Sequence, residues 1–441
     1  MAEAAYRVAI VGGGFSGAML AARLAESGIA SVLINGTTDV GLGVAYSTAF
    51  EGHLLNVRSG RMSAVDGRPD DFVWWLQTHR PELADPIDFA PRKVYGDYVR
   101  DRLATVNAAF PGRIETTVGR VAAIEAAAVH LTGGRTIPAD AVVLATGNPA
   151  PAIASGEAGG RIIGDPWAAG ALDRIAADDS ILIIGTGLTM VDMIQSLLAR
   201  GWKGRATALS RRGLLPRAHA ATPDLAADLP ADALTGPVSN RLAAARATTC
   251  ASGWRGVMEA YRPITADLWA SADADQRARL VRHLRPWWDV HRHRIAPRIS
   301  ETLTELVASR RLRVVAGRLG AVEADGDGVW AGWAPRGGGA QPPLTANWLI
   351  DCTGPAHSPA TDPLTAPLLA SGRARLDPLR LGLDLDPSGR VLDTKGVADP
   401  CLFVLGPPAR AAFWETIAVP DIRKRIEAVV TALSADVRAP G

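Results

Sequence analysis

The apolar positions near the start of the chain change their spacing in an ordered way. Residues 8–11 form a short β-branched run, as a buried parallel strand does. Residues 18–27 repeat apolar side chains at helical spacing, and residues 31–34 form a second strand-like run. This order predicts a β–α–β unit, with a strand, a helix and a second strand packed together.

The turn between the first strand and the helix carries Gly12, Gly14 and Gly17 in the spacing GxGxxG. In such a turn the first glycine permits a tight bend, the second lets the backbone approach a pyrophosphate, and the third lets helix and strand pack closely. The helix N-terminus then offers free N–H groups to the phosphates. The pattern therefore predicts a dinucleotide site. Asn35 stands where an acidic residue usually accepts hydrogen bonds from the ribose, so we expect a neutral and weaker contact there.

A second unit of this kind begins at residue 181. Gly185 and Gly187 follow a short apolar run, and a helical pattern covers residues 188–200. Met190 stands at the third small position of this fingerprint. We therefore expect this helix to pack more loosely on its strand, or in a shifted register.

The strand expected over residues 206–210 ends in two arginines, Arg211 and Arg212. Basic side chains at this place commonly accommodate the 2′-phosphate of a dinucleotide. The second unit therefore predicts an NAD(P) site. The alternative is a structural repeat of the same fold with an empty site.

The two halves of the chain also share a strand that ends in Thr-Gly, at residues 146–147 and at residues 353–354. The second half is longer because a helix-patterned insertion covers about residues 223–312. A hairpin is expected around Asp325. We therefore expect an α/β protein with two Rossmann-like dinucleotide-binding domains and a helical insertion.

The composition narrows the function classes. The chain has 441 residues, 48% of them apolar, and a formal net charge of +2, which argues against a nucleic-acid binder held by phosphate neutralisation. Its 3 cysteines form no CxxC pair, so a dithiol redox enzyme is not expected. Neither a long apolar run nor a signal peptide is evident. We expect a cytoplasmic protein with no membrane or nucleic-acid partner and leave its oligomeric state open.

Histidines gather near the end of the insertion. His291 and His293 lie two residues apart, Asp289 is beside them, and His283 is within reach across helical turns. We expect no metal there, because no further carboxylate or thiolate is near. Three interpretations stay open: helix packing with solvated arginines, a polar network at the domain interface, and recognition of an anionic or carbonyl-bearing substrate. His219 is either part of a nicotinamide path or an ordinary loop histidine.

Five blocks of the chain resemble a known group of proteins. They are GLGVAYST from residue 41, HLLNVRSGRMSA from residue 53, SRRGLLPRAH from residue 210, WDVHRHRIAP from residue 288 and FWETIAVPDIR from residue 413. With the two glycine fingerprints, they resemble the two-dinucleotide-binding flavoproteins, which include flavin-containing monooxygenases and amino-acid N-hydroxylases. More narrowly, they resemble a bacterial FAD/NAD(P)-binding family that includes an FAD-dependent urate hydroxylase and an aspartate N-monooxygenase.

The resemblance implies FAD on the first fingerprint and NADPH or NADH on the second. It implies an FAD-binding domain of residues 1–155 and 355–441, and an NAD(P)-binding domain of residues 156–354. The implied FAD contacts are Gly12, Gly14, Phe15, Ser16, Gly17, Asn35, Val44, Ala45, Tyr46, His53, Asn56, Val121, Ala145, Thr146, Gly147 and Gly406. The implied NAD(P)H contacts are Gly185, Gly187, Arg211 and Arg212.

The last part of the chain departs from the family pattern at one point. Gly406 is followed by Pro407, where relatives often have an aspartate that holds the ribityl chain, so that contact must be absent or supplied otherwise. The last helix is expected to start at Pro420, because proline suits the first helical position.

The function implied by the resemblance is an FAD-dependent, NAD(P)H-consuming monooxygenase. It would use O2 to hydroxylate a small polar nitrogen-containing substrate, urate-like or an amino acid, through a C4a-(hydro)peroxyflavin. The catalytic residues stay unknown, because the cofactor carries the chemistry. Asn56, Trp414 and Glu415 are candidates, and the alternative for the last two is a buried tryptophan beside a surface glutamate.

Other functions stay open. An NAD(P)H:acceptor reductase would share both nucleotide sites without inserting oxygen. An FAD-dependent dehydrogenase or oxidase would take its electrons from the substrate. In a non-enzymatic protein, FAD would be a structural or sensing ligand.

Overall fold

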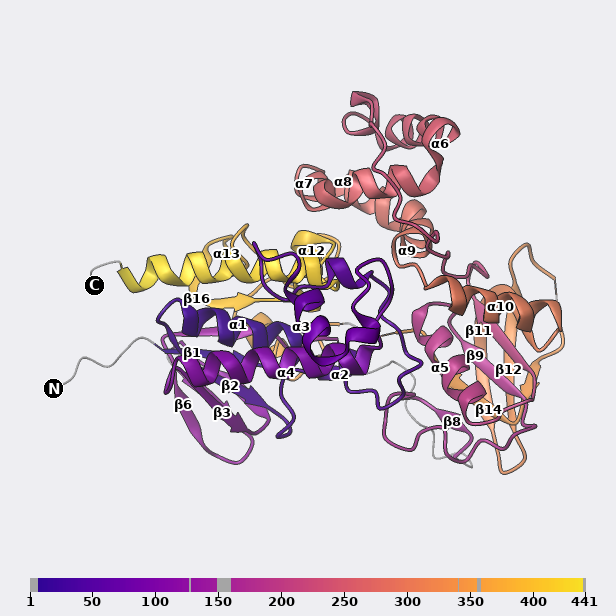
Figure 1. Cartoon of the computed structure of the whole chain (residues 1–441), viewed down its shortest axis with the longest axis horizontal. Helices are drawn as coiled ribbons and strands as arrows, with labels where there is room; N and C mark the ends of the chain where they lie inside the picture. Colours follow the sequence, from indigo (N-terminus) through magenta and orange to yellow (C-terminus); the bar gives the residue numbers. More distant parts are fainter. Residues whose placement is uncertain (1–6, 127, 149–159, 340, 355–357, 439–441) are drawn as a thin grey trace.

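The computed structural model describes residues 7–126, 128–148, 160–339, 341–354 and 358–438. Within these residues the strands form two large sheets and one small one, and a group of helices stands apart from them (Figure 1). The predicted fold class, α/β with two Rossmann-type units, is confirmed. The domain boundaries stay a prediction, and positions 155, 156 and 355 lie outside the described residues.

The first large sheet has six strands in the order β15-β16-β7-β1-β2-β3. Neighbouring strands are parallel except β15 and β16, which are antiparallel. Residues of β1 alternate between the two faces and are buried on both, as expected for a covered parallel sheet. The strand bounds are β1 Arg7–Val11, β2 Ala30–Asn35, β3 Ile114–Val118, β7 Ala141–Leu144, β15 Arg390–Leu392 and β16 Ala398–Val404.

Different layers cover the two faces of this sheet. Helices α1 (Phe15–Glu26), α4 (Arg92–Ala109) and α13 (Val419–Arg438) pack side by side on one face (Figure 1). A small antiparallel sheet covers the other face. Its strands are β4 Val121–Ile124, β5 Ala128–Leu131 and β6 Thr136–Pro138. The first unit is therefore assembled from both ends of the chain.

The second large sheet has seven strands in the order β13-β12-β11-β10-β9-β14-β8. Its five strands from β11 to β8 run parallel, and β11, β12 and β13 form antiparallel hairpins. The predicted hairpin at Asp325 is the one between β11 and β12. Helices α5 (Leu188–Ala199) and α10 (Pro297–Ala308) pack on one face. The strand bounds are β8 Ile162–Ile163, β9 Ile181–Ile184, β10 Ala206–Ser210, β11 Leu312–Ala324, β12 Val329–Pro335, β13 Leu344–Ala346 and β14 Trp348–Asp351.

The insertion rises beyond the two sheets as a separate group of helices (Figure 1). It contains α6 Val238–Tyr261, α7 Thr265–Ala270, α8 Ala274–Arg279, a π-helical segment Leu280–Leu284 and α9 Arg285–Arg292. Gly253 has a φ of +67° and breaks α6 into two pieces. Shorter helices elsewhere are α2 Gly43–Tyr46, α3 Asp71–His79, α11 Ala366–Ala370 and α12 Arg410–Phe413. No helix in the described part of the chain is long and apolar enough to cross a bilayer.

Three details differ from the sequence expectations. Helix α1 begins at Phe15, three residues earlier than expected, because the extended Gly14 serves directly as its N-cap. Helix α13 begins at Val419, one residue before Pro420. The register at Met190 is not shifted: α5 starts directly after Gly187, as α1 starts after Gly14, and the Met190 side chain is fully buried. A flexible methionine can fill the irregular space where glycine would allow closer contact.

Candidate active site

The first glycine turn, between β1 and α1, is closed by the strand end at Ala145. Gly12 has a φ of +111°, and a Cβ there would overlap the carbonyl oxygen of Ala145. A Cβ at Gly17 would overlap the carbonyl oxygen of Gly12, so both positions require glycine. An added Cβ at Gly14 would meet only the backbone of Gly43, at 3.5 Å. Gly14 is half-buried, so part of its surface stays accessible to a phosphate group.

The second glycine turn, between β9 and α5, repeats this geometry. Gly185 has a φ of +106°, and a Cβ there would overlap the carbonyl oxygen of Cys352. At Gly187 no atom lies within 4 Å of an added Cβ, so its backbone faces open space. The same holds for Gly147 and Gly354, which follow the strand ends. The residues at both turns thus fit a dinucleotide pyrophosphate.

Asn35 ends β2 beside the first turn, but its side chain is used within the protein. Its Oδ1 accepts a hydrogen bond from the Gly13 N–H at 3.1 Å. Its Nδ2 donates to the carbonyl oxygens of Thr37 at 3.0 Å and Asp39 at 2.8 Å. Asn35 therefore fixes the loop after β2, and its contact with a ribose stays a prediction.

Gly406 comes close to the first turn from the end of the chain. It has a φ of +78°, and a Cβ there would lie 2.6 Å from the Ser16 hydroxyl. The strand end after β16 therefore borders the N-terminus of α1. Val121 opens the small sheet and is half-buried, while Ala145 continues β7 by donating its N–H to the Val11 carbonyl at 2.8 Å.

Helix α2 carries the predicted cofactor loop over the first turn. Val44 and Ala45 are exposed. Tyr46 points inward, and its ring lies 6.2 Å from that of Phe15 and 4.7 Å from that of Tyr95. Burial raises the pKa of Tyr46, so its phenol stays protonated. This aromatic cluster fixes α2 against α1 and α4.

His53 lies at the contact between the two units. Its Nδ1 is 2.8 Å from the Thr48 hydroxyl, and its Nε2 is 2.9 Å from the Asp192 carbonyl and 2.8 Å from the Ser196 hydroxyl. Burial lowers the pKa of His53. Both ring nitrogens of His53 are within hydrogen-bond distance of protein atoms. His53 therefore holds the loop at Thr48 against α5 and has no free ring nitrogen for a ligand. The side chain of Asp192 pairs with Arg92 at 2.9 Å in the same contact.

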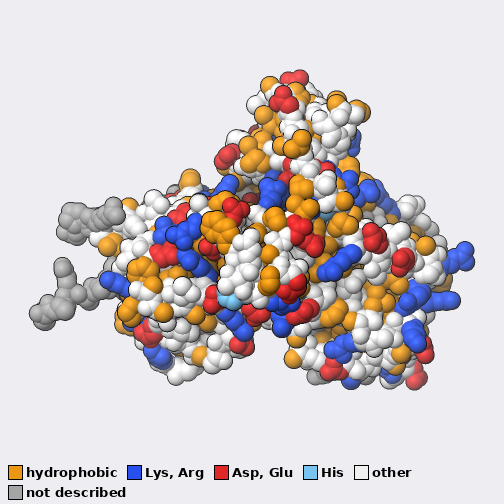
Figure 2. Space-filling view, in the orientation of Figure 1, with side chains coloured by type: hydrophobic (Ala, Val, Ile, Leu, Met, Phe, Trp, Pro, Cys, Tyr) orange, Lys and Arg blue, Asp and Glu red, His pale blue; other side chains and the backbone are white. Residues whose placement is uncertain are grey.

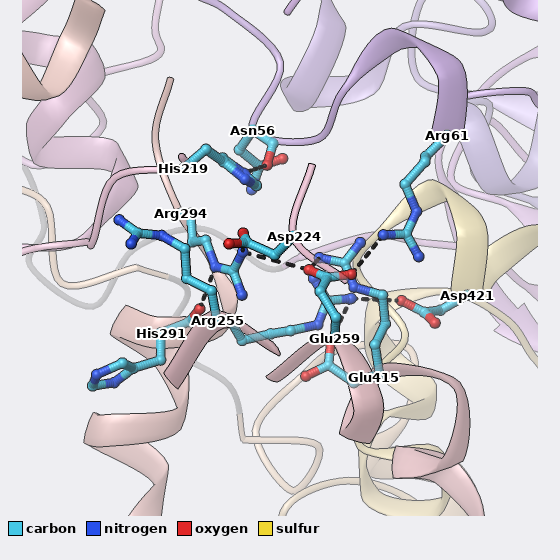
Figure 3. Close-up of polar contacts among 12 residues, drawn as sticks. Asn56, Arg61, His219, Asp224, Arg255, Glu259, His291, Arg294, Glu415 and Asp421 are labelled. Atoms are coloured by element: carbon cyan, nitrogen blue, oxygen red, sulfur yellow. Dashed lines mark hydrogen bonds and ion pairs between the residues drawn. The ribbon is translucent and has the colours of Figure 1, made fainter. Parts of the chain in front are cut away.

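Asn56 and His219 meet in a second contact between the units. His219 is buried, and its Nε2 donates to the backbone carbonyl of Asn56 at 3.0 Å (Figure 3). Burial lowers the pKa of His219 to about 3, so its ring is neutral near neutral pH. As a loop histidine, His219 thus has a structural role, because its ring holds residues 214–219 against the segment that follows His53.

The turn before α13 is strained. Trp414 has φ +59° and ψ −62°, and the Glu415 N–H donates to the Phe413 carbonyl at 2.7 Å, which defines a γ-turn with positive φ. Such turns are rare for a residue with a Cβ and persist where the surroundings hold them. The Trp414 ring is buried and stacks on Trp269 at 4.6 Å. The turn is therefore held against the insertion.

Glu415 is buried, so the alternative of a surface glutamate is wrong. Its Oε1 accepts a hydrogen bond from Trp288 Nε1 at 2.7 Å, and its Oε2 lies 3.6 Å from Arg292. Burial alone would raise the pKa of Glu415, but Arg292 and His293 outweigh it and lower the pKa. Oε2 has no hydrogen-bond partner within the described residues. A buried carboxylate oxygen therefore faces Arg292 at ion-pair distance without accepting a hydrogen bond.

A buried ionic network joins the insertion to the first unit (Figure 3). Arg292 contacts Asp421 of α13 at 3.2 Å as well as Glu415. Arg294 contacts Glu259 at 3.4 Å and Asp224 at 3.5 Å, and Glu259 also pairs with Arg61. Positively charged side chains also gather on the surface around the base of the insertion (Figure 2). The interpretation of residues 287–294 as a polar network thus fits Arg292 and Arg294, which are buried rather than solvated.

The histidines near these arginines have separate surroundings. His291 Nδ1 donates to the Trp287 carbonyl at 2.7 Å, and burial lowers the pKa of His293. His283 lies on the π-helical segment. Within the described residues, no group of three or more His, Cys, Asp or Glu side chains could hold a metal ion.

The sequence comparisons match the start of the chain. Residues 9–149 match the model of an FAD-NAD(P)-binding family. No curated protein matches the chain. The family match covers the first glycine turn, α2 and the Ala145 strand end, which agrees with the predicted dinucleotide site of the first unit.

Solved structures match nearly the whole chain. The ornithine N-hydroxylase of Kutzneria sp. 744 has a TM-score of 0.67 at 16% identity, covering 98% of this chain and 99% of that chain. The L-lysine 6-monooxygenase of Pseudomonas syringae has a TM-score of 0.66 at 16% identity, with 98% and 99% covered. A cadaverine monooxygenase of Erwinia amylovora, bound to FAD, has a TM-score of 0.69 at 13% identity, with 99% and 96% covered. The fold is therefore that of the two-dinucleotide-binding flavoproteins, as the sequence resemblance predicts.

Proposed function

We propose that the protein is an FAD-dependent, NAD(P)H-consuming monooxygenase that hydroxylates an amine-bearing small molecule with O2. The pair of glycine turns carries this proposal, because they have the same geometry beside two separate parallel sheets. Two such turns can hold a flavin and a pyridine coenzyme at the same time. The family match over residues 9–149 supports FAD at the first turn, which leaves the second for NAD(P)H.

The first unit supplies the FAD contacts. The backbone at Gly14 and the N-terminus of α1, with Phe15 and Ser16, would face the pyrophosphate. Gly406 would border the cofactor, because it abuts Ser16. When bound, FAD supplies hydride acceptance and oxygen activation, so the protein's part is position and electrostatics.

The second unit supplies the coenzyme contacts. Gly187 offers an open backbone at the start of α5. Arg211 and Arg212 directly follow β10, Arg211 exposed and Arg212 half-buried, and neither forms an ion pair with another described residue. A 2′-phosphate would give both guanidinium groups a partner. We therefore propose NADPH rather than NADH.

The substrate class follows from the neighbours and from Glu415. The neighbours named above act on ornithine, lysine and cadaverine, all of them amines, which favours an amine over a urate-like substrate. Oε2 of Glu415 pairs with Arg292 at 3.6 Å but accepts no hydrogen bond within the described residues, and we propose that it accepts one from the ammonium group of the substrate. Trp414 would shape the adjacent wall. Asn56 remains a candidate contact through its side chain.

The first test is anaerobic reduction. The purified full-length protein should be yellow, and NADPH should bleach its absorbance at about 450 nm, the usual oxidised-flavin band. Readmission of O2 in the presence of a diamine or amino acid should then yield a hydroxylated product carrying label from ¹⁸O2.

The results separate the candidate functions. A colourless protein, or one that neither coenzyme bleaches, contradicts the proposal. Bleaching by NADPH without labelled product from any amine, but with electron transfer to a quinone or dye, indicates a reductase. Bleaching by a substrate in the absence of coenzyme indicates a dehydrogenase or oxidase.

A further inference from the structure

The insertion contains a cavity of about 350 Å³ that is open to solvent on one side. It lies between α6, α7, the π-helical segment and α9, and the turn at Trp414 contributes one wall. Its volume falls in the range of sites for small organic ligands, near the lower end. Five tryptophans line it: Trp254, Trp269, Trp287, Trp288 and Trp414.

The cavity is built by two parts of the chain. Trp269 Nε1 of α7 donates to the Ala411 carbonyl of α12 at 2.8 Å, which fixes the insertion to the first unit. Trp414 stacks on Trp269, and Trp288 lies between the cavity and Glu415. An occupant would therefore touch the strained turn that precedes α13.

The charged side chains that line the cavity are all positive. Its lining includes Arg241, Arg246 and Arg285 and contains no aspartate or glutamate. Arg285 lies 3.5 Å from Asp289, outside the cavity lining. The guanidinium groups of Arg241 and Arg246 have no hydrogen bond or ion pair with another described residue. Arg241 is half-buried and Arg246 exposed, and almost none of the cavity lining is polar, so both arginines line the cavity with their aliphatic stems. Their charges lie at its mouth, where they are available to an anion.

We propose that this cavity binds a small aromatic compound that carries an anionic group. The ring would lie among the tryptophans, where flat apolar surfaces favour offset or edge-to-face contacts. The anion would receive charge-assisted hydrogen bonds from Arg241 and Arg246. A cation would also be attracted by tryptophan faces, but here it would meet three arginines and no carboxylate in the lining.

The binding proposal goes beyond the monooxygenase assignment and does not rest on it. Affinity can be measured with the FAD-loaded, full-length protein in the absence of any coenzyme. A failure to bind would leave the reduction experiment untouched, and a failure of reduction would leave binding untouched.

Isothermal titration calorimetry with three compounds that share one ring tests the charge. The probes are indole-3-acetate, 3-methylindole and tryptamine, which are anionic, neutral and cationic near neutral pH. We expect indole-3-acetate to bind with a Kd below about 1 mM and about tenfold more tightly than tryptamine. No binding of any of the three, or tighter binding of tryptamine, would overturn the proposal.

Substitutions on α6 test whether the ligand binds in this cavity. Ala245 lines the cavity, whereas Ala243 is exposed and lies on the other side of the same helix. Ala245→Phe should fill the cavity and weaken indole-3-acetate binding by about tenfold or more, and Ala243→Phe should leave it unchanged. Equal affinities of the two variants would place the ligand elsewhere and refute the site.

The double variant Arg241→Gln, Arg246→Gln tests the anion contact separately. It should lower the affinity for indole-3-acetate to that for 3-methylindole while leaving the neutral compound's affinity unchanged. Because 3-methylindole binding reports an intact cavity, a folding defect is distinguishable from a lost charge contact. An unchanged preference for the anion would refute the role of these arginines.

Discussion

At the scale of single residues, Gly12 of the first turn tolerates no side chain. A methyl group there would overlap the Ala145 carbonyl and force an L side chain into a positive φ. Gly12→Ala should therefore lower the FAD content of the purified protein by about tenfold or more, since strain of this kind costs roughly 1–3 kcal/mol. The flavin-to-protein absorbance ratio measures this.

Gly133→Ala is the matched control for this substitution. No atom lies within 4 Å of an added Cβ at Gly133, which is in the turn between β5 and β6. The control should retain its FAD. A full flavin content in Gly12→Ala would show that the cofactor does not depend on this turn.

His219 makes the free energy of unfolding depend on pH. Burial lowers its pKa from 6.5 to about 3 in the folded state. Between these values the unfolded chain binds a proton that the folded chain does not, so the free energy of unfolding falls as the pH falls below 6.5. The slope from this group is at most about 1.4 kcal/mol per pH unit.

His219→Gln should flatten that dependence, because glutamine keeps an N–H donor for Asn56 and does not titrate. Urea unfolding midpoints at pH 7.5 and pH 5.5 should differ less in this variant than in the natural protein. His79→Gln, at an exposed position on α3, should leave the difference unchanged. An unaltered pH dependence in His219→Gln would exclude His219 as its source.

At the scale of elements, we expect the end of β10 to decide which coenzyme the protein uses. Exchanging both Arg211 and Arg212 for alanine should raise the KM for NADPH by about tenfold or more and change that for NADH much less, because only NADPH carries the 2′-phosphate. Steady-state NAD(P)H oxidation measures both constants. Equal increases would mean that the arginines do not contact the phosphate.

The elements that the sequence predicts are those with local signals. The strands and helices flanking Gly12 and Gly185 follow from β-branched runs and glycine spacing within a few residues. The break of α6 at Gly253 and the π-helical segment have no such signal. No local sequence pattern predicts the burial of Glu415 either, since its hydrogen-bond partner Trp288 is 127 residues away.

Sequence reasoning finds residues more readily than their partners. The block around His291 draws attention to its histidines, yet the neighbouring Arg292 and Arg294 form the buried ion pairs. Their partners Glu259 and Asp421 lie on distant segments and follow no motif. A dense cluster of arginines in an apolar insertion is the one signal that could have indicated such a network.

At the scale of the whole molecule, Asp192 connects the two large units. It is buried and pairs with Arg92, but burial raises its pKa although Arg92 opposes the shift. Asp192→Asn should cost about 1–3 kcal/mol, since the amide oxygen can still accept a hydrogen bond from Arg92 but no longer balances its charge. Asp192→Ala leaves Arg92 without its carboxylate and should cost about 3–5 kcal/mol.

Urea unfolding followed by tryptophan fluorescence measures both effects. Asp173→Ala removes an ion pair with Arg200 whose side chains are 60% and 51% exposed, and should cost no more than about 1 kcal/mol. If the asparagine variant loses as much stability as the alanine variant, the charge itself holds the units together.

The assembly of the first unit from both ends of the chain has a consequence for synthesis. A ribosome releases the strands of the second sheet, between residues 162 and 351, before it translates β16, Gly406 and α13. Domains generally fold as units during translation. The nascent protein must therefore carry an open edge beside β7 while its middle completes folding, and messages truncated before codon 398 should yield colourless polypeptides.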